Sequence, residues 1–275
     1  MAWNRPAESP DDLLSRLGSL TAEARERAEG QRARIELALA LQRDMLPADL
    51  PDVPGLRVAA RYRPADTGLN VGGDWYDGFR LPDGSLCFSI GDVQGHNIEA
   101  AAFMGQVRVG LRALASVVRD PGELLARTND LVLSLGGALF ATCTLMRFDP
   151  FTWELETARA GHVPTVWALA AGQSGVMDDA GGLPLGIEEG AEYPVTLYRP
   201  ATAGAFVFVT DGVVEGPSLA VDKGLGQVAR LAGDAVVAGT DADDLASGVM
   251  ELASSIGHED DAAVLVICHD APRPA

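Results

Sequence analysis

The sequence lacks several features that would place it in common classes of protein. It has 3 cysteines, Cys87, Cys143 and Cys268, and no Cys-x-x-Cys pair. The odd number and the spacing argue against a disulfide framework and favour buried, reduced thiols. No stretch reaches the roughly 18 uninterrupted apolar residues of a membrane span. We therefore expect a soluble, cytoplasmic protein that does not associate with a membrane.

Basic residues are also scarce. The chain has 21 Lys and Arg against 39 Asp and Glu, a net charge of −18. Nucleic-acid and anionic-membrane surfaces need basic patches, so this balance argues against both kinds of partner. The first 46 residues are nearly neutral, with 7 Arg against 8 Asp or Glu, so most of the acidity lies in the remainder. A protein partner or a metal site fits this composition better.

The length of 275 residues allows one large domain with an appendage. Residues 11–46 lack proline and are rich in Ala, Glu, Arg and Leu, which predicts a helix. Mostly apolar residues recur at steps of three and four from Leu13 to Met45, although Ala28, Gln31 and Gln42 weaken the pattern. This pattern fits either a seam that pairs two helices or a helix packed on its own domain. Prolines from Pro47 onward end it, so we predict a helical linker or regulatory segment at 1–46 and a domain at 47–275.

The remainder predicts many strands, with helices grouped in blocks and no strict alternation of strand and helix. This arrangement is typical of an α+β layered fold. The expected strands are 56–63, 86–92, 139–148, 153–160, 163–169, 193–198, 205–210 and 262–268, after an earlier short strand that Asp74 begins. The expected helices are 98–118, 120–134, 222–232 and 241–256.

The stretch 68–104 holds an acidic residue that needs a partner. In the strand from Leu86 to Asp92, alternate residues are apolar, so Asp92 lies on the apolar face at the end of the strand. Burying a carboxylate unpaired costs several kcal/mol. No Lys or Arg lies between Asp83 and Gly105. A hard divalent cation would neutralise this charge.

Three other aspartates occupy similar places. Asp74, Asp211 and Asp260, like Asp92, lie at strand ends or in turns beside strands. Without a cation, each close pair of carboxylates would repel by roughly 4 kcal/mol at an effective dielectric of about 20. Ligand sets made only of oxygen select Mg²⁺, Mn²⁺ or Ca²⁺. The alternative is that these are ordinary turn aspartates.

Six motifs, in order, resemble those of PPM-type (protein phosphatase 2C superfamily) serine/threonine phosphatases of the SpoIIE-like bacterial branch. They are Val71-Gly-Gly-Asp-Trp-Tyr-Asp77, Ile90-Gly-Asp-Val-Gln-Gly-His96, Ala160-Gly-His-Val-Pro164, Leu183-Pro-Leu-Gly186, Val209-Thr-Asp-Gly-Val-Val-Glu215 and Asp260-Asp261. The resemblance covers about 56–269. It implies a layered α-β-β-α sandwich with two central, mainly antiparallel sheets. It also implies two Mn²⁺ or Mg²⁺ ions, whose bound water attacks a phosphoserine or phosphothreonine.

The resemblance assigns roles to individual residues. Asp92 would bridge both metals with help from the Val93 carbonyl, Asp74 would hold one metal, and Asp211 and Asp260 the other. Asp77 and Asp261 would support these ligands. His96 is a candidate catalytic residue, but it lies four residues after Asp92, and a loop-structuring role is the alternative. His162 fits a turn better than catalysis.

Two positions depart from the family pattern, Asn97 in place of a glycine and Ala263 in place of a threonine. They keep open the alternative of a catalytically silent domain that binds a regulatory protein. The resemblance suggests a phosphorylated substrate such as an anti-anti-sigma protein. Leu41-Gln-Arg-Asp-Met-Leu-Pro47 looks like the linker that joins a sensor to the phosphatase in this family. We expect the helix before it to form a homodimer.

Overall fold

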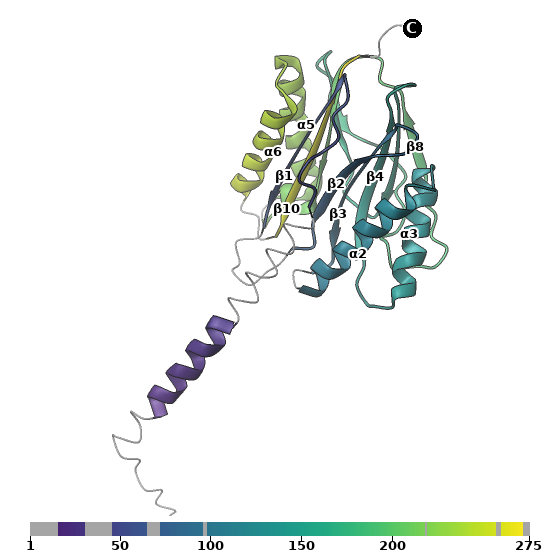
Figure 1. Ribbon diagram of the computed structural model, residues 1–275. Helices are drawn as coiled ribbons and strands as arrows, with labels where there is room; N and C mark the ends of the chain where they lie inside the picture. The colour runs from purple at the N-terminus through teal and green to yellow at the C-terminus, as the bar shows by residue number, and fades with distance from the viewer. Residues whose placement is uncertain are drawn as a thin grey trace, which may run out of the picture.

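The computed structural model describes residues 16–30, 46–64, 72–95, 98–217, 219–256 and 260–271. Two five-stranded antiparallel sheets form its centre (Figure 1). The first sheet has the order β1-β10-β9-β6-β7, and the second has the order β2-β3-β4-β5-β8. The strands of the first sheet are β1 (Leu56–Arg63), β6 (Val166–Leu169), β7 (Ser174–Val176), β9 (Gly204–Val209) and β10 (Ala262–His269). Those of the second are β2 (Trp75–Arg80), β3 (Leu86–Val93), β4 (Ala141–Asp149), β5 (Glu154–Ala160) and β8 (Val195–Tyr198).

Helices cover the outer face of each sheet (Figure 1). Helices α2 (Ile98–Leu114) and α3 (Pro121–Leu135) pack on the second sheet, and α5 (Val221–Ala238) and α6 (Ala242–Ile256) pack on the first. A single-turn helix, α4 (Asp211–Val214), follows β9 directly. The predicted α-β-β-α sandwich is therefore confirmed.

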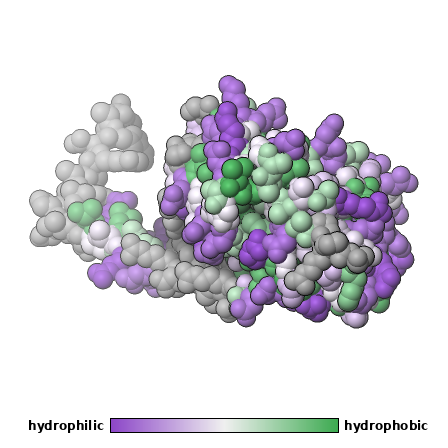
Figure 2. All heavy atoms as spheres, turned by 90° about the horizontal axis from the view of Figure 1, so that it is seen from above, coloured by the Kyte–Doolittle hydropathy of each residue, from purple (hydrophilic) through white to green (hydrophobic). Residues whose placement is uncertain are grey.

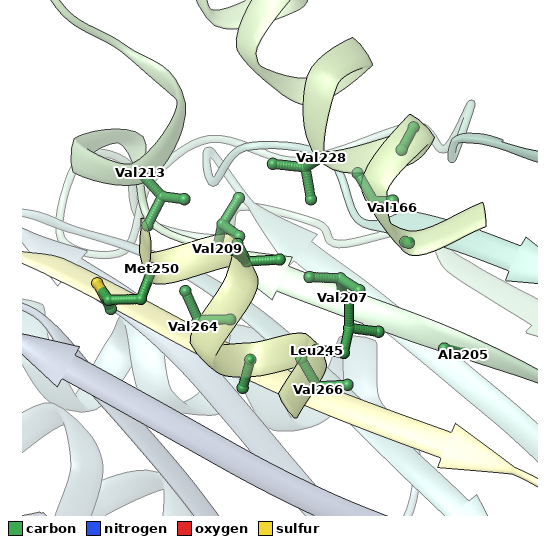
Figure 3. Close-up of a cluster of buried hydrophobic side chains, with 14 of the residues drawn as sticks. Val166, Ala205, Val207, Val209, Val213, Val228, Leu245, Met250, Val264 and Val266 are labelled. Atoms are coloured by element: carbon green, nitrogen blue, oxygen red, sulfur yellow. The ribbon is translucent and has the colours of Figure 1, made fainter. Parts of the chain in front are cut away.

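Three apolar clusters hold these layers together. One lies between the first sheet and its helices, where valines of β9 and β10 point toward Val228, Leu245 and Met250 (Figure 3). A second lies between the second sheet and α2 and α3, and the third fills the space between the sheets. Because β9 and β10 have apolar neighbours on both faces, all of their residues are buried, as their nearly continuous apolar sequences predict.

Most predicted elements are present, with shifted ends. Helix α3 begins as expected, since the Asp120 carboxylate accepts a hydrogen bond from Glu123 N at 2.8 Å and Pro121 follows the cap. Helix α5 continues six residues beyond its predicted end because it packs on β6 and β7, and it ends at the left-handed Gly239. The short β7 and α4 were not predicted.

At the N-terminus, the described part of the expected helix is residues 16–30. All of these residues are exposed, including Leu17 at 62% and Leu20 at 57%. The rest of the predicted helix lies outside the described residues. The next described residue, Leu46, packs against the cluster under α2 and α3. Within the described parts of the chain, no helix has the length and apolar content to cross a bilayer.

The surface seen from the end where the chain terminates is mainly hydrophilic, with smaller hydrophobic areas between (Figure 2). The candidate site lies at the opposite end, because β10 begins there and runs toward the C-terminus (Figure 1).

Candidate functional site

Two of the predicted site residues come from the second sheet. Asp92 is the penultimate residue of β3, and Asp74 directly precedes β2. These strands pair with Trp75 opposite Gly91, so one more step of the register sets Asp74 opposite Asp92. The glycine at 73 allows this approach, since a Cβ there would lie 2.5 Å from the Val93 carbonyl oxygen. Asp74 and the Val93 carbonyl therefore lie close to Asp92.

The other acidic residues come from the first sheet. Asp211 begins α4 just after β9, and Asp260 and Asp261 precede β10. Strands β9 and β10 are antiparallel neighbours, with Val209 opposite Val264, so the end of one meets the start of the other. A Cβ on Gly212 would lie 2.0 Å from the Asp261 carbonyl oxygen, so only glycine permits this contact.

The packed sheets bring the two acidic groups together. Burial, and next the negative charge of Asp211 on the other sheet, raise the pKa of Asp92 to about 7. Burial also raises the pKa of Asp74 well above its usual range, with added repulsion from Asp92, Asp261 and Asp211. The pKa of Asp211 rises through burial and the charge of Asp260. Asp74, Asp92 and Asp211 are therefore harder to ionise because of burial and of negatively charged neighbours.

Four of these aspartates make no ion pair within the described part of the chain: Asp74, Asp92, Asp211 and Asp260. Asp74 Oδ2 is buried and has no hydrogen-bond partner among the residues that the structure describes. Such an oxygen is costly unless something binds it, and this oxygen-only donor set suits a hard divalent cation. Among the described residues, no group of three or more His, Cys, Asp or Glu side chains is arranged as it would be around a metal ion.

A hollow of about 350 Å³ opens beside the acidic group. It is lined by Asp211, Asp260 and Glu215, together with Gly212, Gly216 and Pro217. Sequence reasoning gave Glu215 no role, although it lies in the motif that contains Asp211. The spacing of four residues across α4 was the signal, since it puts both side chains on one side of a single helical turn.

Asp77 has a different place from the one expected. It is buried on β2, and its carboxylate pairs with Arg112 of α2 at 3.3 Å, with Arg108 4.0 Å away. Period-two geometry explains this result, because Asp77 shares the face of Trp75, which packs beneath α2. Asp77 therefore attaches α2 to the sheet, whereas Asp261 is the supporting residue that joins the acidic group.

Of the two histidines in the motifs, only His162 lies within the described residues. His96 and Asn97 lie outside the described residues. His162 is buried, and its Nδ1 lies 2.8 Å from the Thr142 hydroxyl. Thr142 faces Asp92 across the β3–β4 ladder. No local sequence signal marks Thr142, since only the strand register brings it to the site.

Known proteins resemble this chain over most of its length. Protein IcfG of Synechocystis sp. is 27% identical over 216 residues, and phosphoserine phosphatase RsbU of Bacillus subtilis is 25% identical over 185. These matches cover 68% and 67% of this chain but only 33% and 54% of the relatives, so the chain spans about half or less of their length.

Solved structures share the fold. The RsbU and RsbW domains of a Mycobacterium tuberculosis protein superpose with a TM-score of 0.74 at 32% identity, over 84% of this chain and 64% of that one. RsbX, solved in complex with magnesium, superposes with a TM-score of 0.62 at 14% identity, over 81% and 99%. The family model for SpoIIE, stage II sporulation protein E, matches residues 82–270, more than half of the sequence. The chain belongs to the SpoIIE family.

Proposed function

We propose that the chain is a metal-dependent phosphatase that hydrolyses phosphoserine or phosphothreonine on a regulatory protein, such as an anti-anti-sigma factor. Membership of the SpoIIE family and the similarity to a phosphoserine phosphatase support the reaction class. The observation that carries the proposal is that carboxylates from the two sheets lie close enough together to raise the pKa values of Asp74, Asp92 and Asp211.

Two Mn²⁺ or Mg²⁺ ions fit these residues. Asp92 would contact both ions with the Val93 carbonyl beside it, Asp74 would hold one, and Asp211 and Asp260 the other. The unpartnered Asp74 Oδ2 supports this assignment, and the magnesium complex of RsbX gives a precedent within the fold. Such ions activate water and clamp phosphate oxygens during phosphoryl hydrolysis.

The protein's own groups would prepare the site in two ways. Because the pKa of Asp92 is about 7, this carboxyl is partly protonated at neutral pH, and ion binding would release its proton. The hollow lined by Asp211, Asp260 and Glu215 would admit the phosphorylated side chain beside the ligands.

The test is hydrolysis of a phosphoserine peptide and of p-nitrophenyl phosphate, with Mn²⁺ present or chelated. We expect turnover only with Mn²⁺, and its loss in Asp92→Asn. Asp83→Asn is the matched control, since Asp83 pairs with Arg119 and Arg147 on another part of the second sheet. Mn²⁺ binding without turnover in the unaltered protein would support the silent, protein-binding alternative. Turnover that survives chelation would overturn the metal-dependent mechanism.

A further inference from the structure

His162 lies in the link between the two sheets. It follows β5 of the second sheet and precedes β6 of the first, just after the left-handed turn at Gly161, where φ is +63°. Its side chain is 4% exposed. A turn needs only the glycine, so the turn does not explain why the next residue is a buried histidine.

The ring of His162 contacts the strand beside Asp92. Its Nδ1 lies 2.8 Å from Thr142 Oγ1. Thr142 and Asp92 are direct partners in the β3–β4 ladder, so their side chains share one face, with Cβ atoms about 4.5–5.5 Å apart. That face is the one between the sheets, because Met146 and Phe148 of the same strand point into the cluster there.

The backbone of His162 is held as firmly as the ring. Arg159 Nη1 donates a hydrogen bond to the His162 carbonyl oxygen at 2.8 Å. Arg159 is fixed in turn by Asp179, whose carboxylate lies 2.8 Å from Nη2. Both side chains are largely buried, so this pair is shielded from solvent. The imidazole therefore has little freedom to leave its place.

The ring is uncharged and also faces the first sheet. Burial lowers the pKa of His162 to about 4, against a weaker upward effect of the Val209 backbone. The Val209 backbone is near enough to the imidazole to act on its pKa, although Nε2 makes no hydrogen bond within the described part of the chain. Val209 ends β9, two residues before Asp211. The His162 imidazole thus lies between β4, whose Thr142 faces Asp92, and β9, which leads to Asp211.

We propose that His162 is a positioning residue: through Thr142 on one sheet and Val209 on the other, it sets the separation of the Asp92 and Asp211 halves of the metal site. The inference rests on the proposed function, because it concerns the same carboxylates. Deleting the Thr142 contact should let the halves drift apart and weaken metal binding roughly 10-fold, the low end for residues that orient metal ligands.

The test is Mn²⁺ binding measured by isothermal titration calorimetry on the full chain, which does not depend on turnover. Thr142→Val removes the hydroxyl at nearly constant volume, and Thr142→Ser retains it. Thr144→Val is the matched control, because Thr144 lies two residues along the same face and its buried hydroxyl has no hydrogen-bond partner. We expect weaker Mn²⁺ binding in Thr142→Val alone, with Thr142→Ser and Thr144→Val close to the unaltered protein.

A second comparison tests whether the two side chains act as one unit. His162→Ala should weaken Mn²⁺ binding, and adding Thr142→Val to it should cause no further loss. Thermal melts with a chelator check that the variants fold. Equal affinities in Thr142→Val, Thr144→Val and the unaltered protein would overturn the role of His162 and leave the proposed function intact. An unaltered protein that binds no Mn²⁺ would instead overturn the proposed function.

Discussion

The two ends of the space between the sheets are chemically opposite. At one end Leu86, Phe148, Leu155, Phe206 and Ile267 pack in an apolar cluster. Edge-to-face contacts join Phe148 to Trp153 and Tyr198 to Phe206, each with ring centroids 5.1 Å apart. At the other end, the same strands or the residues next to them supply Asp74, Asp92, Asp211 and Asp261.

Along a single strand, one end therefore stabilises the fold, and the other end supplies residues of the candidate site. The apolar end is stabilised by burial alone, at about 1.5–3 kcal/mol for each large side chain. The acidic end opposes folding when its carboxylates are ionised, as the raised pKa values of Asp74, Asp92 and Asp211 indicate. The predictions below test whether the two ends are as independent as this contrast implies.

The largest effect is expected at the acidic end, on activity. Asp211→Asn should lower Mn²⁺-dependent turnover of a phosphoserine peptide on the order of 10³-fold or more, because one ion loses a charged ligand. His96→Ala should lose less than roughly 10²-fold, the lower bound for a general acid or base. Circular dichroism would check folding. Near-normal turnover in folded Asp211→Asn would break the two-metal assignment, and a complete loss in His96→Ala would make the histidine catalytic.

At the apolar end the expected effect is on stability alone. Phe148→Ala should lower the free energy of unfolding by about 3–5 kcal/mol, since it leaves a cavity among fully buried side chains. The Mn²⁺ affinity of the folded variant should stay unchanged. Urea unfolding and calorimetric titration measure the two quantities. A large loss of Mn²⁺ affinity would show that the ends are coupled.

The apolar end was also the easier one to predict. Alternating or continuous apolar runs located β1, β3, β9 and β10 within about a residue of their ends, because burial on one or both faces dictates their composition. Asp92 could be assigned to the apolar face at the end of its strand for the same reason. The short β7 and α4 escaped notice because three or four residues carry no periodicity.

The partners of the acidic residues were harder to foresee. Thr142 meets Asp92 only through strand register, and His162 reaches Thr142 only because the chain crosses between sheets there. The family resemblance gave Asp77 a supporting role beside the metal ligands, but Asp77 lies three residues after Asp74 along the chain, so its side chain is on the opposite face, beside Arg112. Side-chain direction, more than position in the sequence, decided which aspartates belong to the site.

A smaller effect should appear in the stability of the metal-free protein. The pKa of Asp92 is about 7 in the fold, above its ordinary value of 3.8. The stability that the protonated Asp92 carboxyl contributes is therefore fully present below pH 3.8, and it is lost as the pH rises through 7. Asp92→Asn removes this dependence, so its stability advantage over the unaltered protein should grow by about 2 kcal/mol from pH 5.5 to pH 8.

Thermal melts in the presence of a chelator would measure this difference. Both proteins contain His162 and His269, so the titration of these histidines cancels in the comparison. Adding Mn²⁺ should reverse the order at pH 8, because the ions stabilise only the protein that binds them. An advantage that does not change with pH would show that Asp92 is not strained by its neighbours. The acidic end would then carry no folding cost.

The smallest effect on stability is expected from the N-terminal helix. Every residue from 16 to 30 is exposed, so a chain starting at Leu46 should unfold with a free energy within about 0.5 kcal/mol of the full chain. Leu46 is kept because it packs under α2 and α3.

We propose nevertheless that this helix pairs two copies and adjusts the acidic end through the Met45–Leu46 junction. Leu17→Glu with Leu20→Glu should then yield monomers in light scattering and alter turnover, whereas Ser19→Glu, on another side of the helix, should do neither. If the full chain is already monomeric and as active as the shortened one, the helix does not act on the site, and the contrast between the two ends is a property of the folded domain alone.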